Sequence, residues 1–186
     1  SAARELVDSG EIDVLTGDWL AELTMLILAR QRMKHGAGSG YARTFVTQME
    51  QVMGTCLDRG IKVVSNAGGL DPAGCAAAVA EVAEKLGLHP RIAYVQGDDL
   101  VARLPELQAA GHTFDNLDTG ESLVDKGVEV ITANAYLGCW GIVEALGHEP
   151  QRPPGFEGIE ALPKRFSVLP ADVNAVKRYI ESHVSD

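Results

Sequence analysis

Aspartates in turn-rich segments are the residues of this sequence best suited to chemistry. The candidates for catalysis are Asp18, Asp98 and Asp118. A carboxylate can ligate a hard cation such as Mg²⁺, accept a hydrogen bond from a sugar hydroxyl, or remove a proton as a general base. Each aspartate alone also fits an ordinary role, because carboxylates commonly cap helices or face solvent. The set therefore carries more weight than any one member, and a divalent cation is one candidate cofactor.

A segment with almost no side-chain bulk, Ser65-Asn66-Ala67-Gly68-Gly69, precedes the helix start Asp71-Pro72. An aspartate cap followed by proline predicts a helix N-terminus, whose unpaired N–H groups attract anions. Gly68 and Gly69 could therefore cradle a phosphate, a carboxylate or an oxyanion. Enlarging Gly69 should then weaken ligand binding and leave the fold largely intact. The alternative is that both glycines only allow a tight turn to close.

Four side chains add hydrogen-bond donors that could orient a carbonyl or an oxyanion. With Gly68 and Gly69 they complete the predicted ligand-binding set, and they are Ser65, Asn66, Asn134 and Tyr136. Cys75 lies in the first turn of the predicted helix, where the helix N-terminus could lower its pKa. The alternative for Cys75 is a small apolar residue packed on the sheet.

Short apolar runs alternate with helical patterns of roughly ten to eighteen residues, which predicts an α/β fold. The predicted strands are Ile12–Leu15, Ile61–Val64, Arg91–Val95 and Val128–Thr132. We expect a mostly parallel sheet flanked by helices, Rossmann-like and doubly wound. Parallel strands end at one edge, so the segments that follow them should share that edge. An enzyme would need Asp18, Asn66, Asp98 and Asn134 to line one cleft.

The composition changes after Leu146, because five of the eight prolines lie beyond it. Proline interrupts helices and central strands. We therefore expect an α/β domain over residues 1–146 and a proline-rich arm with a C-terminal helix over residues 147–186.

The net charge, the hydrophobic pattern and the cysteine count restrict the class of protein. A formal net charge of −10 over 186 residues argues against nucleic-acid and anionic-membrane partners. No apolar run approaches the roughly 20 residues of a membrane span. The three cysteines show no Cys-x-x-Cys spacing, which favours a reducing cytoplasm over a disulfide framework.

Several stretches, in this order, resemble the acyclic terpene utilization protein (AtuA) family. They are Ile12–Glu22, Leu26–Arg30, Gly60–Ala78, Gly97-Asp98-Asp99, Leu117–Glu121 and Ala133–Gly138. The resemblance implies a cytoplasmic protein of acyclic terpenoid breakdown, whose intermediates are carried as coenzyme A thioesters. It suggests an enzyme that performs a hydratase or lyase step on a branched acyl-CoA or carboxylate, and a homo-oligomer is a further expectation. A non-catalytic binding subunit or scaffold of the same pathway is the alternative.

The sequence departs from this family at both ends. Members begin with a further strand and glycine-rich turn before the equivalent of Ser1, and continue after Leu146 with a strand that ends in a Gly-Arg turn. We therefore expect that segments are missing at both places. Covalent neighbours have Cα atoms about 3.8 Å apart, so the spacing over residues 145–149 tests the second departure.

Overall fold

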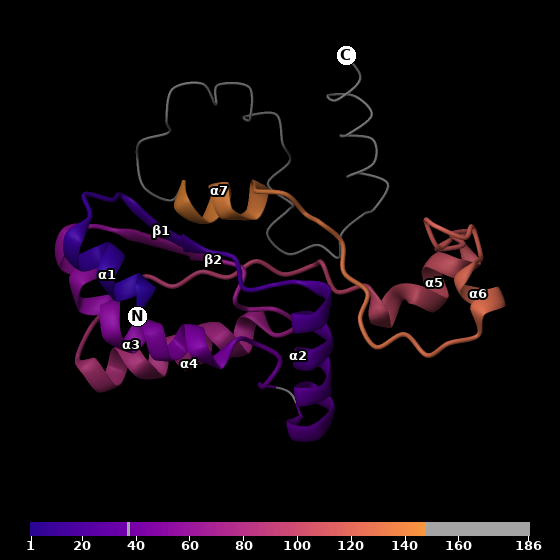
Figure 1. Ribbon diagram of the computed structural model, residues 1–186, viewed down its shortest axis with the longest axis horizontal. Coiled ribbons are helices and arrows are strands. Elements are labelled where there is room, and N and C mark those ends of the chain that lie inside the picture. Colours follow the sequence, from indigo (N-terminus) through magenta and orange to yellow (C-terminus); the bar gives the residue numbers. More distant parts are fainter. Residues whose placement is uncertain (37, 148–186) are drawn as a thin grey trace, which may run out of the picture. The chain divides into compact units, whose positions relative to one another are not determined.

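The computed structural model describes residues 1–36 and 38–147 (Figure 1). These residues divide into two compact units. The first contains Ser1–Gln96 and the segment that begins at Cys139, and the second contains Gly97–Gly138. Among the described residues, no helix is both long enough and apolar enough to cross a membrane.

The first unit holds both strands and the longer helices. Its elements are α1 (Ala2–Ser9), β1 (Val14–Gly17), α2 (Glu22–His35), α3 (Arg43–Arg59), β2 (Lys62–Ser65), α4 (Pro72–Leu86) and α7 (Trp140–Leu146). The second unit contains short helices, namely η1 (Val101–Arg103), α5 (Leu104–Ala109) and α6 (Leu123–Lys126).

The sheet of the first unit consists of β1 and β2, which run parallel. Val14 pairs with Lys62 at one end of the ladder, and Gly17 pairs with Ser65 at the other. The two predicted strands that these residues belong to are confirmed, and so is the parallel direction. Because both strands end at the same edge, the segments that follow Gly17 and Ser65 start beside each other.

Two other predicted strands are wrong. Arg91–Val95 and Val128–Thr132 form no strand in the described structure, whose sheet has two strands. Tyr94 is 53% exposed and Val128 is 54% exposed, so these apolar segments lack the covering layer that a buried strand needs. The coarse α/β class is confirmed, and the doubly wound arrangement remains a prediction.

Helix α4 follows its predicted signals closely. The Asp71 side chain accepts a hydrogen bond from the Gly74 N–H at 2.9 Å, and Pro72 occupies the first turn. Gly87 ends the helix at φ 66°, in the left-handed region that glycine adopts easily.

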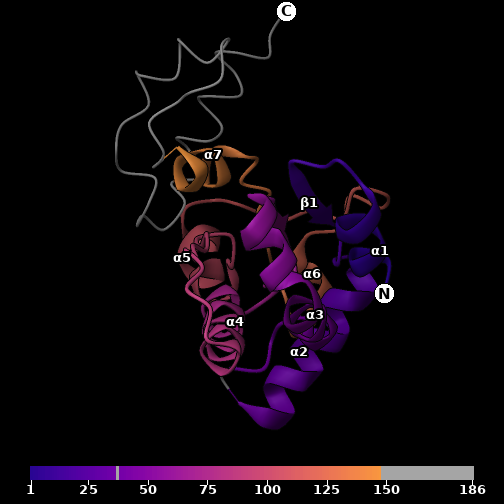
Figure 2. The same cartoon turned by 90° about the vertical axis from the view of Figure 1, so that its left-hand side faces the viewer.

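The core of the first unit lies where α1, α3 and α4 meet the strands, and Figure 2 shows α3 and α4 side by side. Val7 and Val52 are fully buried there. The buried cluster also contains Ala3, Leu15, Met49, Met53, Cys56, Ile61, Val82 and Ala83. This core fixes the strands and therefore the segments at their ends.

The predicted proline-rich arm and C-terminal helix lie outside the described residues. The test of the Cα spacing over residues 145–149 needs residues 148 and 149, which also lie outside the described residues.

Candidate functional site

The segments that follow β1 and β2 are joined by a pair of predicted site residues, Asp18 and Asn66. Asn66 Nδ2 donates a hydrogen bond to Asp18 Oδ1 at 2.7 Å. The Trp19 N–H donates in turn to Asn66 Oδ1 at 2.8 Å. The Asn66 amide is therefore held at both ends, which fixes its orientation against the carboxylate. This geometry confirms that the two segments share one edge of the sheet.

The surroundings of Asp18 stabilise its charged form. The Asn66 side chain and then the Leu20 N–H, 3.1 Å from Asp18 Oδ1, lower the pKa of Asp18 from its ordinary value. Asp18 is exposed and is therefore ionised at neutral pH. A general base works best when its pKa lies near the working pH. This geometry favours a fixed hydrogen-bond acceptor over a group that carries a proton.

Ser65 closes the turn after β2. Its Oγ donates to the Gly17 carbonyl at 3.3 Å and accepts from the Ala67 N–H at 3.1 Å. The hydroxyl therefore links the two strand ends beside the Asp18–Asn66 pair.

The glycine-rich turn uses its own N–H groups internally. The Gly69 N–H donates to the Asn66 carbonyl at 3.1 Å, and the Asp71 N–H donates to the Gly68 carbonyl at 2.8 Å. The Leu70 N–H donates to the carbonyl of Gly40 at 2.8 Å. Anion binding at Gly68 and Gly69 stays a prediction, and a ligand there would have to displace these bonds or use other donors.

The expectation that Gly69 can be enlarged without harm to the fold is wrong. Gly69 is buried and has φ 53°. A Cβ atom at this position would lie 2.4 Å from Leu28 Cδ1 and 2.9 Å from the Gly40 carbonyl oxygen. The close approach of Leu28 and the backbone of Gly40 therefore gives Gly69 a packing role.

Cys75 is a packed residue with a raised pKa. Burial is the larger cause and the nearby Asp71 carboxylate is the second, and together they raise the pKa of Cys75 to about 11. The helix N-terminus does not offset these effects. The packing alternative for Cys75 is therefore the correct one.

A second pair of predicted site residues meets in the second unit. Asn134 Nδ2 donates to Asp98 Oδ2 at 2.9 Å, and both side chains are partly buried. The backbone supports this contact, because the Ala135 N–H donates to the Asp98 carbonyl at 2.8 Å. An isolated antiparallel bridge joins Asp99 to Asn134. The structure therefore brings Asp98 and Asn134 together, as it does Asp18 and Asn66.

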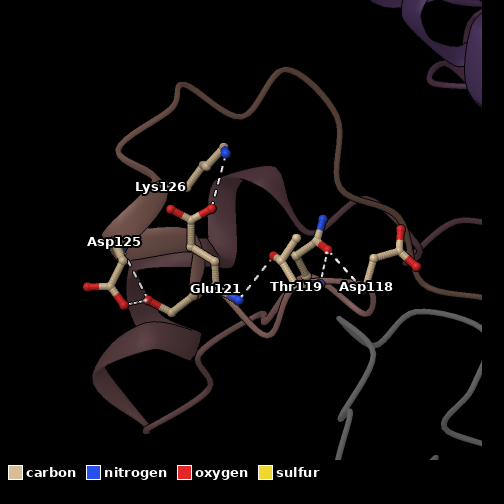
Figure 3. Close-up of polar contacts among 7 residues, drawn as sticks. Asp118, Thr119, Glu121, Asp125 and Lys126 are labelled. Atoms are coloured by element: carbon tan, nitrogen blue, oxygen red, sulfur yellow. Dashed lines mark hydrogen bonds and ion pairs between the residues drawn. The ribbon is translucent and has the colours of Figure 1, made fainter.

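Asp118 lies in a turn of the second unit. Asn116 Oδ1 accepts hydrogen bonds from the N–H groups of Asp118 and Thr119, each at 2.9 Å. Figure 3 shows the Asp118 carboxylate pointing away from Glu121, whose Oε2 pairs with Lys126 Nζ at 3.0 Å. The turn therefore orders its backbone with side-chain oxygens and leaves the Asp118 carboxylate exposed.

Tyr136 is 96% exposed and extends into solvent. Within the part of the chain that the structure describes, no three His, Cys, Asp or Glu side chains converge in a way that could hold a metal ion.

Two hollows of the surface contain none of the predicted site residues. The larger, of about 430 Å³, is lined by Val101, Leu104, Pro105, Gln108, Leu123, Val124, Gly127, Val128 and Val130. The smaller, of about 340 Å³, is lined by Ala80, Ala83, Glu84, Gly87, Leu88, His89, Pro90 and Ile92. Sequence reasoning missed the larger hollow because its residues come from η1, α5, α6 and the segment after α6. The cluster of valines in residues 101–130 was its one visible signal.

These features define an α/β protein whose two parallel strands end in an interlocked Asp–Asn pair. The model of the family described as Acyclic terpene utilisation family protein AtuA matches residues 1–151. The chain therefore belongs to the AtuA family, as its sequence motifs suggested, and that family is named for acyclic terpene utilisation.

One curated relative is a threonine synthase of Methylobacillus glycogenes, which is 38% identical over 76 residues. That stretch is 39% of this chain and 16% of the relative. The chain thus spans a small part of that protein's length. No solved structure matches the chain.

Proposed function

We propose that this protein acts in the cytoplasm as an enzyme of acyclic terpenoid breakdown. Its substrate is a branched acyl-CoA or a related carboxylate, and its reaction is the addition or removal of water or a comparable lyase step. The observation that carries the proposal is the Asp18–Asn66 pair, found at the carboxyl ends of parallel strands in a member of the AtuA family. Ligands of parallel α/β proteins bind beyond these strand ends.

The roles of the two residues follow from their contacts. Both hydrogen bonds recorded at the Asp18 carboxylate reach Oδ1. Oδ2 is therefore the oxygen that can accept a hydrogen bond from a substrate hydroxyl or water, or contact a divalent cation. Asn66 keeps the carboxylate charged and in place. Asp98 and Asn134 form a similar pair within the second unit.

A thermal-shift titration of the full chain tests this function. The probes are a branched terpenoid acyl-CoA, free coenzyme A and Mg²⁺, because a ligand that binds the native state raises its stability. The thioester should raise the melting temperature of the wild type and raise it less in Asp18→Asn. Asp13→Asn is the matched control, because Asp13 is an exposed carboxylate just before the same strand.

Mass spectrometry of the thioester after incubation then tests catalysis. The expected result is the gain or loss of one water molecule by the wild type. The proposal fails if no thioester is bound or changed, or if Asp13→Asn and Asp18→Asn behave alike.

A non-catalytic binding subunit or scaffold is the second candidate, and exposed apolar side chains on α2 favour it. Leu23 is 68% exposed, Ile27 is 45% exposed and Met33 is 72% exposed. Such side chains mark protein interfaces when they gather on one element. Sedimentation of the wild type and of Leu23→Ser/Met33→Ser tests this candidate. Association that the double substitution abolishes would support a scaffold, and a monomer at every concentration would count against self-association.

A further inference from the structure

We infer that the outward side of α2 binds a second copy of this chain, on an acidic and apolar surface formed by α1 and the start of β1. Both surfaces belong to the first unit. The inference rests on the scaffold candidate of the proposed function, for which it names the partner, and it does not depend on the proposed enzyme activity.

Helix α2 packs against the rest of the first unit through one side. Leu28 and Ala29 are its buried residues, and Leu28 lies against Gly69. Arg32 Nη1 donates to the Leu70 carbonyl at 3.3 Å. Among the described residues, no closely packed pair of helices or strands includes α2. A helix of 14 residues owes its stability mainly to tertiary packing, so a partner that covers the other side of α2 would stabilise it.

One face of α2 is exposed along its length, with apolar side chains first and basic ones later. We call it the outer stripe, and its members are Leu23, Ile27, Arg30 and Lys34. Their spacing of three or four residues is that of neighbours on one side of a helix. The ion pairs of the described residues involve neither Arg30 nor Lys34. The outer stripe therefore presents two large apolar side chains and two cations to a partner.

The outer stripe belongs to a basic stretch of an acidic chain. Residues 23–49 include no aspartate or glutamate, although they include four arginine or lysine residues. The whole chain has a formal net charge of −10, so its acidic groups lie outside this stretch. Complementary charges steer two proteins together, and a second copy of the chain supplies the acidic side.

A surface of complementary charge lies on α1 and at the start of β1, two elements that contact each other. Leu6 is 49% exposed and Val14 is 47% exposed. Three exposed carboxylates accompany them, and none takes part in an ion pair of the described residues: they belong to Glu5, Glu11 and Asp13. We call these five residues the N-terminal acidic surface. Its carboxylates complement the cations of the outer stripe, and both surfaces expose apolar side chains.

Two other occupants fit the outer stripe less well. Pairing of α2 with the α2 of a second copy would bring like charges together in a parallel arrangement. An antiparallel arrangement would instead place apolar side chains against cations. A helix that lies in a lipid interface carries its charged and apolar side chains on opposite faces, whereas the outer stripe contains both kinds.

The proposed contact joins different surfaces of the two copies. Figure 1 and Figure 2 both show α1 and α2 at separate places on the first unit. One copy can therefore use both surfaces at once, with two different neighbours, and such head-to-tail contacts produce rings or open chains. Helix α2 is about 21 Å long at 1.5 Å per residue, so each contact is small. We therefore expect weak, reversible association.

Sedimentation velocity of the full chain at increasing protein concentration tests the inference. The wild type should self-associate, and raising the salt from about 0.05 M to about 0.5 M should weaken this association, because salt screens exposed charges. Arg30→Glu/Lys34→Glu and Glu11→Lys/Asp13→Lys should each weaken it about 10-fold or more, since each brings like charges together. Lys85→Glu is the control for a change in net charge, because Lys85 is an exposed cation in the last turn of α4.

A mixture of the two charge-reversal variants gives the decisive measurement. In either variant alone, the outer stripe and the N-terminal acidic surface have charges of the same sign. In the mixture, the reversed stripe of one variant meets the reversed surface of the other, and the two unchanged surfaces also match. The mixture should therefore associate as the wild type does, although each variant alone is monomeric. Circular dichroism of each variant checks folding.

The inference is overturned if the wild type is monomeric at every concentration, or if the mixture of folded variants does not associate. It is also overturned if high salt leaves the association unchanged. A monomeric wild type that sediments with phosphatidylglycerol vesicles would assign α2 to a membrane surface instead. If a charge-reversal variant does not fold, Arg30→Gln/Lys34→Gln replaces it, and unchanged association of that folded variant would refute the contact.

This inference and the proposed enzyme fail in different ways. Thioester turnover by a protein that is monomeric at every concentration would keep the enzyme and remove the contact. Association that the mixture restores, together with no binding or turnover of any thioester, would keep the contact and remove the enzyme.

Discussion

Replacing Gly69 by alanine should destabilise the first unit for a reason that the local geometry makes explicit. An L-residue in the left-handed region costs about 1–2 kcal/mol, and Gly69 has φ 53°. Its added Cβ would also lie 2.4 Å from Leu28 Cδ1 and 2.9 Å from the Gly40 carbonyl oxygen. Overpacking of this kind costs about 1–3 kcal/mol.

These two costs are partly offset in the unfolded chain. Replacing glycine by alanine reduces the freedom of the unfolded state, which returns about 0.4–1 kcal/mol. The expected fall in the free energy of unfolding for Gly69→Ala is therefore roughly 2–4 kcal/mol.

Gly87→Ala is the matched control. Gly87 has φ 66°, and an added Cβ would meet no atom within 4 Å. Only the conformational cost applies there, so the expected fall is about 1 kcal/mol or less. The difference between the two variants isolates the contact with Leu28 and the Gly40 carbonyl.

Urea unfolding followed by tryptophan fluorescence measures both variants. Trp19 and Trp140 both belong to the first unit, so the signal reports its unfolding. A change in midpoint with an unchanged slope reports stability alone. Equal destabilisation of Gly69→Ala and Gly87→Ala would refute the packing argument. The earlier prediction, that Gly69 is small so that a ligand can approach the backbone, would then be preferred.

Two further predictions concern titratable groups. The folded pKa of Asp18 is lowered, so the unfolded chain binds its proton more readily. The wild type should therefore gain stability over Asp18→Asn from the charged Asp18 carboxylate. This gain in unfolding free energy is fully present above the unfolded pKa of about 3.9, and it is lost as the pH falls through the lower pKa of the folded state. Urea unfolding between about pH 2 and pH 7 measures it, and a difference that grows with acidity would contradict it. Cys139 is exposed, whereas Cys56 and Cys75 are buried with raised pKa values. Iodoacetamide at mildly alkaline pH should hence label Cys139 first and Cys75 only after unfolding. Peptide mass spectrometry measures the labelling of each cysteine. Rapid labelling of Cys75 in the native protein would contradict the prediction.

The parts of the fold that the sequence predicted well depend on local signals. The start of α4 needs only the Asp71 side chain, Pro72 and the neighbouring N–H groups, and its end needs only Gly87. The pairing of β1 with β2 follows from two β-branched runs separated by helices. The limits of α4 depend on local contacts alone, whereas the pairing of Val14 with Lys62 is long-range and was found from the alternation of strands and helices.

The parts that failed depend on neighbours that a local pattern does not contain. Arg91–Val95 has the composition of a strand, but a strand also needs a partner and a covering layer. The cost of enlarging Gly69 was missed because Leu28 and Gly40, which surround it, are distant in the sequence. The larger surface hollow was missed for the same reason, because no single helix contains its lining.

The sequence predicted that Asp18 and Asn66 share one edge of the sheet, and the geometry of their contact changes the chemistry that Asp18 suits. Sequence reasoning placed Asp18 among residues for catalysis, with general-base work as one option. The Asn66 amide and the Leu20 N–H instead stabilise the carboxylate and lower its pKa. A carboxylate held in this way gives up proton affinity and gains a fixed orientation. Binding and orienting a hydroxyl group or a cation therefore suits Asp18 better than carrying a proton. Substitution of Asp18 should accordingly change ligand affinity more than it changes the pH dependence of the reaction.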